Sequence, residues 1–237
     1  MHIGQGIRRT DGKDKLTGTA LYVDDIQLEG LLHGATVRSP HAHARILGIR
    51  WEEGFDASDL ILVTAAEISG ENTIYLMTRD QPALAAEVVL HVAEPVALVA
   101  APTRTRALEA VKHVVVDYEV LEPLMDATEA EGSDRVIFAP DNVFKAIDIE
   151  KGQVDSVTEG RVVEGRYHTG LHEQLYIEPQ GMIASPREDG GMTFIGSLQC
   201  PYYIVKGIAA LLGEGFEEPG RITVVQAATG GGFGGKE

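Results

Sequence analysis

The sequence predicts a mixed α and β fold, and three neighbouring segments are the main evidence for it. Residues 96–101 form a continuous apolar run, which is typical of a strand buried on both faces. A short apolar stripe at helical spacing follows at residues 107–111, with Thr103 as the expected N-cap. Residues 114–120 are again rich in β-branched side chains. A strand, a helix and a strand with tight connections predict a βαβ unit, and therefore a partly parallel sheet.

The flanking segments supply further elements of both kinds. Residues 31–38 and 44–49 predict two short strands separated by Ser39-Pro40. The stretch from residue 121 to residue 142 contains two prolines and several acids, and it predicts a connector between domains.

Four strands and one helix are expected after the connector. The first three strands are predicted at residues 162–168, 181–185 and 192–198. The helix is predicted from the spacing of Ile204, Ile208, Leu211 and Leu212, and Gly213 is expected to end it. A last strand at residues 221–226 leads directly into a run of glycines.

Composition excludes several classes of protein. The net charge of −16, with acidic residues scattered along the chain, argues against a nucleic-acid partner and against an anionic membrane surface. No apolar run approaches the roughly 18 residues of a membrane span. The polar first residues predict no secretory signal. A single cysteine excludes an internal disulfide and a zinc site built on several thiolates, so a cytoplasmic location is the simplest expectation.

Residues 230–235 contain five glycines and carry the strongest chemical signal. Glycine permits positive φ and close approach of another group, so such a loop can hold a phosphate, hold an oxyanion, or simply turn the chain. Gly230, four residues and then Gly235-Lys236 match a nucleotide P-loop, but Glu237 stands where Ser or Thr is needed. A nucleotide site is therefore disfavoured. A plain connector is the default interpretation, and Phe233 and Gln199 weaken it.

The remaining candidate residues favour structural roles. His41 and His43, with His33 nearby, have the spacing of neighbours on one side of an extended segment, and a metal site there is disfavoured. His168 and His172 are four apart, but Gly170 between them disfavours a metal-binding helix. Cys200 is expected to be buried and inert.

Several stretches together resemble one family. Residues 230–237, Gly-Gly-Gly-Phe-Gly-Gly-Lys-Glu, resemble the molybdopterin-contacting loop of xanthine dehydrogenases and related molybdenum hydroxylases. Residues 6–9, 15–26 and 32–46 resemble the opening of the same subunit, and residues 176–179 resemble the stretch that opens its molybdenum domain. The matches run in the family's order along the chain. The resemblance implies an α+β protein, with an α/β-hammerhead domain at residues 1–122, a connector at 123–139 and the first part of a molybdopterin-binding domain at 140–237.

The resemblance also implies roles for individual residues. Gln199 matches a glutamine that hydrogen-bonds near the molybdenum ligands, a task for which a side-chain amide offers both donor and acceptor. Phe233 and Gly234, with Gly232 beside them, match cofactor-binding positions whose backbone lies against the apical oxo group. Glu237 matches the position of a substrate-binding glutamate in purine-oxidising members, whereas aldehyde-oxidising members have an apolar residue there. No residue of the chain is expected to bind the metal directly.

The implied reaction is hydroxylation of a purine-like N-heterocycle, with oxygen from water and electrons passed to iron–sulfur clusters and FAD on partner subunits. The family's base glutamate lies downstream of the glycine run, so no catalytic residue is expected within these residues, and a remaining molybdenum-domain segment or subunit would complete the site. Two alternatives stay open: an aldehyde oxidase-type subunit, and a non-catalytic binding or assembly module. Residues 230–237 are also expected to be mobile in the isolated chain, because a terminal segment without anchoring contacts tends to be disordered.

Overall fold

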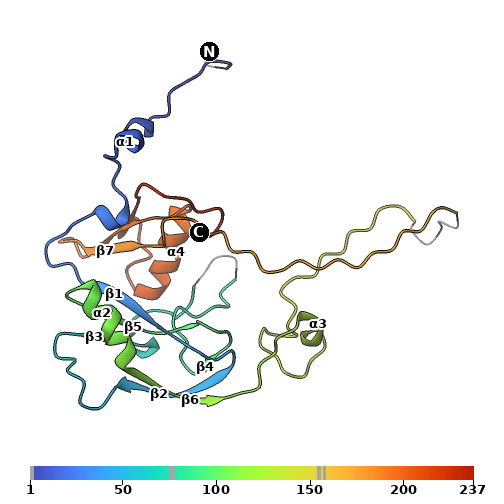
Figure 1. The fold of residues 1–237 in the computed structure, drawn as a ribbon, viewed down its shortest axis with the longest axis horizontal. Coiled ribbons are helices and arrows are strands. Elements are labelled where there is room, and N and C mark those ends of the chain that lie inside the picture. The colour runs from blue at the N-terminus through green and yellow to red at the C-terminus, as the bar shows by residue number, and fades with distance from the viewer. Residues whose placement is uncertain (1–2, 75–77, 154–155, 157–158) are drawn as a thin grey trace. The chain divides into compact units, whose positions relative to one another are not determined.

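The structure, a computed structural model, describes residues 3–74, 78–153, 156 and 159–237. The chain divides into two compact units, of which the first comprises Met1–Val120 and Gln174–Glu237 and the second comprises Leu121–Glu173. Figure 1 labels helices α1, α2 and α4 and strands β1 to β7 of the first unit. Its short helical segments near the start are α1 (Gly12–Thr17), η1 (Val23–Asp25) and η2 (Ala65–Glu67).

Two three-stranded antiparallel sheets form the first part of this unit. One has the order β1-β5-β3 and the other the order β4-β2-β6. The strands are β1 (His33–Arg38), β2 (Ala44–Trp51), β3 (Ile61–Val63), β4 (Val88–Val89), β5 (Pro95–Ala101) and β6 (Val114–Val120). The predicted strands at 31–38, 44–49, 96–101 and 114–120 are confirmed as elements.

The helix between β5 and β6 is confirmed, but the predicted parallel pairing of these strands is wrong. Helix α2 (Arg104–Ala110) begins after Thr103, whose hydroxyl accepts a hydrogen bond from the Arg106 N–H at 3.2 Å. The 3₁₀ turn η3 (Val111–His113) then leads into β6, which pairs with β2 in the second sheet, whereas β5 pairs with β1 and β3. The apolar run predicted that β5 is buried, but burial does not specify which strand takes its hydrogen bonds.

One apolar core joins the two sheets and α2. Val89, Val96 and Val99 are its largest fully buried side chains. Ala110 of α2 belongs to the same cluster, and side chains of β2 and β6 pack against it. This core holds the hammerhead-like part together by apolar burial, at roughly 25 cal/mol per Å² of apolar surface.

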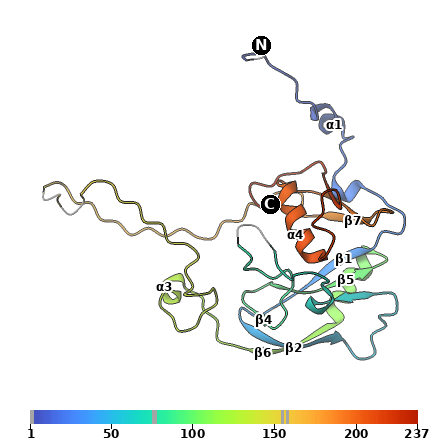
Figure 2. The same ribbon diagram turned by 180° about the vertical axis from the view of Figure 1, so that it is seen from behind.

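A βαβ unit that was not predicted occurs later in the chain. Strands β8 (Met192–Gly196) and β9 (Ile222–Gln226) pair in parallel, α4 (Pro201–Leu212) connects them, and β7 (Met182–Pro186) lies antiparallel on the other side of β8. Phe194, Ala209 and Ile222 form the core between α4 and this sheet. Helix α4 lies against the sheet in both views (Figures 1 and 2). The predicted helix and its end at Gly213, where φ is +84°, are confirmed.

The second unit contains the short helix α3 (Ala127–Ala130). The Asn142 side chain organises the loop after it, since its oxygen accepts hydrogen bonds from the N–H groups of Ile137 and Phe138. The strand predicted at residues 162–168 is wrong: these residues are neither helix nor strand, and Val162 and Val163 are exposed. A β-branched pair favours a strand only where a neighbouring strand accepts its backbone hydrogen bonds.

Across the described ranges, no helix combines the length and the apolar character needed to cross a bilayer.

Candidate functional site

The glycine loop, defined here as residues 230–237, follows β9 and returns toward the end of β8. The Ala227 N–H donates to the Gly196 carbonyl at 2.9 Å, which extends the β8–β9 pairing up to the loop. Within the loop, the Gly235 N–H donates to the Gly232 carbonyl at 2.8 Å. The Gln199 N–H donates to the Lys236 carbonyl at 2.7 Å. The expectation of a mobile segment assumed that it lacks anchoring contacts, and these contacts contradict that assumption.

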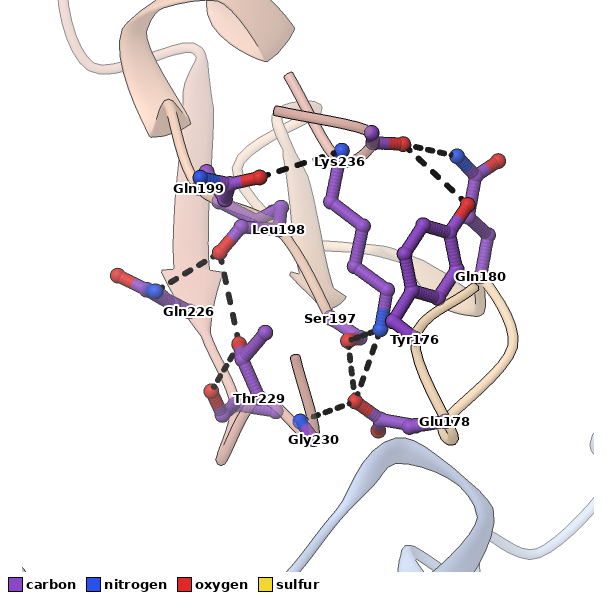
Figure 3. A network of polar contacts seen from close by, with 12 residues as sticks. Tyr176, Glu178, Gln180, Ser197, Leu198, Gln199, Gln226, Thr229, Gly230 and Lys236 are labelled. Carbon is purple, nitrogen blue, oxygen red and sulfur yellow. Dashed lines mark hydrogen bonds and ion pairs between the residues drawn. The ribbon is translucent and has the colours of Figure 1, made fainter. Parts of the chain in front are cut away.

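Lys236 points into the protein. Its side chain is fully buried, with the ammonium nitrogen 3.0 Å from Glu178 Oε2 and 2.6 Å from Ser197 Oγ (Figure 3). The same nitrogen lies 4.7 Å from the centroid of the Tyr176 ring, in a cation–π contact. A P-loop lysine has to reach a bound phosphate from the open side of its loop. Lys236 is directed away from the open side, so the geometry agrees with the sequence argument against a nucleotide site.

Glu178 is the acceptor at the centre of this network. Its Oε2 accepts hydrogen bonds from Ser197 Oγ at 2.5 Å and from the Gly230 N–H at 2.6 Å, in addition to the ammonium of Lys236. Partial burial by itself raises the pKa of this carboxyl. The hydrogen bonds from Ser197, Gly230 and Lys236 together outweigh burial, so the pKa of Glu178 lies below its ordinary value. Glu178 is therefore held as a carboxylate.

The segment before β7 lies under the loop and explains several of its glycines. Tyr176 Oη and Gln180 Nε2 both donate to the Gly235 carbonyl, at 3.4 Å and 2.6 Å (Figure 3). A Cβ at Gly230 would lie 2.6 Å from the Cβ of Glu178, and one at Gly235 would lie 2.6 Å from the Tyr176 ring. These glycines are required by close packing on the protein side of the loop.

Gln199 connects the loop to the start of α4. Its Oε1 accepts from the Gly234 N–H at 2.9 Å and from the Lys236 N–H at 3.4 Å. Because two N–H groups donate to the same side-chain atom, that atom must be the amide oxygen, and this assigns the orientation of the Gln199 amide. The Nε2 group then has no hydrogen-bond acceptor among the described residues, and the residue is exposed. A Cβ at Gly232 would lie 2.4 Å from Gln199 Oε1, so the glutamine occupies the space beside Gly232.

The outer side of the loop consists of exposed groups. Phe233 and Gly234 have φ of +51° and +87°, and the Phe233 side chain is 75% exposed. A Cβ on Gly234 would meet nothing within 4 Å. Glu237 is also exposed and lines a pocket of about 290 Å³. The other residues around that pocket include Gln180, Met182, Leu198 and Ile204.

The predicted site residues therefore divide into two groups. Gln199, Gly232 and Gly234 are in contact or hydrogen-bonded with one another, whereas Phe233 and Glu237 extend from the same loop toward solvent. The donors left without an acceptor among the described residues are the Gln199 Nε2 group and the backbone N–H groups of Gly231, Gly232 and Phe233. Such donors suit a group with anionic oxygen ligands, and the open side of Gly234 leaves room for one. The residues present thus fit a cofactor that bears anionic oxygen.

Sequence reasoning missed the residues that hold the loop in place. In the sequence, Glu178 belongs only to a matching stretch, and Lys236 belongs only to the P-loop-like spacing and to the matching stretch at residues 230–237. Ser197 was not singled out at all. Three polar residues spread over 59 positions have no local spacing that would connect them. A polar residue at the end of the apolar β8 run, as Ser197 is, was the one available signal.

The other candidates of the sequence take no part in the site. The His41 ring packs edge-on against Tyr118, with centroids 5.0 Å apart. Residues 168–172 form no helix. Cys200 is half-buried, less than expected, and directly precedes α4. Among the described residues, no group of three His, Cys, Asp or Glu side chains lies together as a metal site would require.

Two family models match the chain. Residues 17–122 match the aldehyde oxidase and xanthine dehydrogenase a/b hammerhead domain, and residues 137–237 match the molybdopterin cofactor-binding domain. The chain is 31% identical over 236 residues to the xanthine dehydrogenase of Dictyostelium discoideum, which covers 99% of this chain and 17% of that protein. It is 29% identical over 239 residues to the large molybdopterin subunit of nicotinate dehydrogenase from Eubacterium barkeri. This match covers 99% of this chain and 55% of that protein.

A solved structure has the same fold. The aldehyde oxidoreductase of Desulfovibrio gigas superimposes with a TM-score of 0.83 at 28% identity, covering 95% of this chain and 27% of that one. The chain thus spans about half, or less, of the length of these relatives.

Proposed function

This chain belongs to the xanthine dehydrogenase and aldehyde oxidase family of molybdenum hydroxylase large subunits, with a hammerhead domain and the start of a molybdopterin-binding domain, and from this premise we propose that it forms one wall of the molybdenum site in an enzyme that hydroxylates a purine-like N-heterocycle. The observation that carries the proposal is a set of donors with no acceptor among the described residues, namely the Gln199 Nε2 group and the N–H groups of Gly231, Gly232 and Phe233. We place the domain boundaries of this proposal at residues 122 and 140.

The role of each residue follows from the contacts of the loop. When bound, the molybdenum cofactor supplies the metal centre on which the substrate carbon is oxidised by two electrons with oxygen from water. Gln199 uses its oxygen to hold the Gly234 N–H, so its Nε2 group is the part that donates to the cofactor. The Phe233 N–H has no acceptor among the described residues, whereas Gln199 already holds the Gly234 N–H, and the open side of Gly234 leaves room for the cofactor. These donors stabilise anionic oxygen without having to reorganise.

Glu237 supports the substrate class. Its carboxylate is exposed and lines the pocket beside Gln180 and Ile204. A carboxylate accepts hydrogen bonds from the N–H groups of an N-heterocycle, whereas an aldehyde has no such donor. We therefore propose a purine-like heterocycle over an aldehyde. The family's base glutamate, the remaining pterin-binding loops, and the iron–sulfur and FAD centres belong in this proposal to the downstream segment and to partner subunits, in a cytoplasmic complex.

The experiment is metal analysis of the complete subunit that contains these residues, expressed with its partner subunits. We expect about one molybdenum per subunit, and kcat/KM for xanthine above that for benzaldehyde. Replacement of the carboxylate by an apolar residue, Glu237→Leu, is expected to lower kcat/KM for xanthine by about 10-fold or more, because a hydrogen-bonding site loses its specific partner. Its isosteric control, Glu237→Gln, keeps the shape and should lose less.

Two outcomes would favour the alternatives. Molybdenum in the complex with a preference for aldehydes, unchanged in Glu237→Leu, would identify an aldehyde oxidase-type enzyme. A folded complex without molybdenum would contradict the enzyme proposal and support a non-catalytic binding or assembly module.

A further inference from the structure

We propose that Glu178 is a positioning residue that ties the two ends of the glycine loop to each other and to the sheet, with Lys236 as its counter-ion. We call Glu178, Ser197 and Lys236 the clamp. The proposal concerns the shape of the loop, and its importance for the cofactor rests on the function proposed above.

A single oxygen atom makes all the connections. Glu178 Oε2 accepts from the Gly230 N–H at the first residue of the loop, at 2.6 Å, and from the ammonium of Lys236 near its last residue, at 3.0 Å. Ser197, directly after β8, donates to the same oxygen at 2.5 Å and accepts from Lys236 at 2.6 Å (Figure 3). The start of the loop, its end and the end of β8 therefore meet at one carboxylate.

The burial of the clamp favours one arrangement of the glycine loop over others. The Lys236 side chain is fully buried and the Glu178 side chain is 17% exposed. A buried ion pair adds little to stability compared with an apolar pair of the same volume, but the loss of one partner leaves a costly unpaired charge. Loop arrangements that carry Lys236 away from Glu178 are therefore disfavoured.

The clamp also affects the residue next to Lys236. Lys236 is buried, the adjacent Glu237 is exposed, and both residues line the same pocket, so the clamp fixes the backbone from which Glu237 extends. In this proposal the clamp acts through the position of the loop amides and of Glu237.

The test is hydrogen–deuterium exchange of the complete subunit, prepared without cofactor and compared as wild type and Glu178→Gln. We expect the amides of residues 230–237 to exchange at least about 10-fold faster in Glu178→Gln, because the carboxylate that pairs with the buried ammonium is lost, while peptides from β8 and β9 stay unchanged. The matched control is Glu109→Gln, which removes an exposed carboxylate 3.7 Å from Arg106 and should leave the loop's exchange unchanged.

If Glu178 only stabilised the fold in general, Glu178→Gln would give a different pattern of amide exchange. Acceleration spread equally over β8, β9 and the loop, or no acceleration in the loop, would overturn the proposal. If Glu178→Gln does not fold, Ser197→Ala removes one contact of the clamp and leaves the ion pair. It is then expected to accelerate exchange in the loop alone, by less than Glu178→Gln would, and unchanged exchange would count against the clamp.

The two proposals fail separately. Local acceleration in Glu178→Gln combined with absence of molybdenum from the wild-type complex supports the clamp and contradicts the molybdenum site. Molybdenum in the wild-type complex combined with unchanged loop exchange in Glu178→Gln supports the molybdenum site and contradicts the clamp.

Discussion

The hammerhead core and the glycine loop are stabilised in different ways. Val89, Val96 and Val99 are buried among apolar neighbours that lie in regular strands. The glycine loop has no regular structure and is held by a carboxylate, an ammonium, a hydroxyl and a side-chain amide. Apolar burial is non-directional, so it tolerates small shifts, whereas hydrogen bonds demand particular distances and angles. Directional hydrogen bonds and an ion pair therefore position the region expected to bind a cofactor, whereas non-directional apolar burial holds the hammerhead core together.

The largest effect is expected for Val99→Asp, which tests the apolar hammerhead core. Val99 is fully buried in β5, and a carboxylate without a partner there is expected to cost more than about 4 kcal/mol in the free energy of unfolding. Chemical denaturation followed by circular dichroism measures it. The neighbouring Leu98 is 41% exposed, so Leu98→Asp is the matched control and should cost much less. Equal losses in the two variants would contradict the assignment of the core.

The packing of the loop is tested by Gly232→Ala. The added methyl would lie 2.4 Å from Gln199 Oε1, so either the glutamine or the loop must move. We expect a loss of about 1–3 kcal/mol, as for overpacked sites, and faster amide exchange at Gly234 and Lys236. Gly34→Ala in β1 is the control, because nothing lies within 4 Å of a Cβ there. A Gly232→Ala variant as stable as Gly34→Ala would show that Gln199 does not occupy this space.

Lowering the pH should weaken the contacts of the glycine loop before it weakens the apolar hammerhead core. The hydrogen bonds from Ser197, Gly230 and Lys236 keep the pKa of Glu178 below the ordinary value of 4.5 in spite of its partial burial. A carboxyl with a lowered folded-state pKa contributes stability above its unfolded pKa, and that contribution is lost as the pH falls through the folded pKa. Protection of the loop amides, corrected for intrinsic exchange, should be constant above pH 4.5 and fall below it. Glu178→Gln should remove this pH dependence, and its persistence there would assign it to another group.

A smaller effect is expected at the start of α2. The Thr103 hydroxyl accepts from the Arg106 N–H at 3.2 Å, and Thr103→Ala should cost about 1 kcal/mol by thermal or chemical denaturation. Thr103→Ser keeps the acceptor and serves as the control. If both variants lose the same stability, the hydroxyl is not the cap.

The smallest effect is expected for an exposed ion pair. Arg50 and Asp117 lie 3.1 Å apart on β2 and β6, with both side chains more than half exposed. Water and salt screen such a pair, so Asp117→Asn should change the free energy of unfolding by less than about 1 kcal/mol. A larger loss, measured at moderate salt, would show that the contrast between this pair and the buried clamp is overstated.

The elements of the fold could largely be predicted from local patterns. The apolar run at residues 96–101, the N-cap Thr103 and the helical spacing before Gly213 each depend on a few adjacent residues, and each is confirmed. The partner of each strand could not be predicted in the same way. Residues 96–101 and 114–120 have the composition of neighbours in a parallel sheet, yet they pair in different sheets. Strand pairing depends on segments far along the chain, which local periodicity does not report.

The candidate site shows the same division between local and distant information. Gln199 and the glycines of the loop were predicted, because glycine composition and a family pattern are properties of short stretches. The direction of Lys236 and the central place of Glu178 were not, because they depend on 58 residues of chain folding back until two charges meet. Most strands and helices and the glycine-rich run could be predicted from the amino-acid sequence, since they follow from steric preference and apolar spacing, although the strand expected at residues 162–168 does not form. Only the tertiary structure decided that the lysine turns inward to an ion pair while Glu237 stays outside, since a buried charge is stable only where distant residues supply its partner.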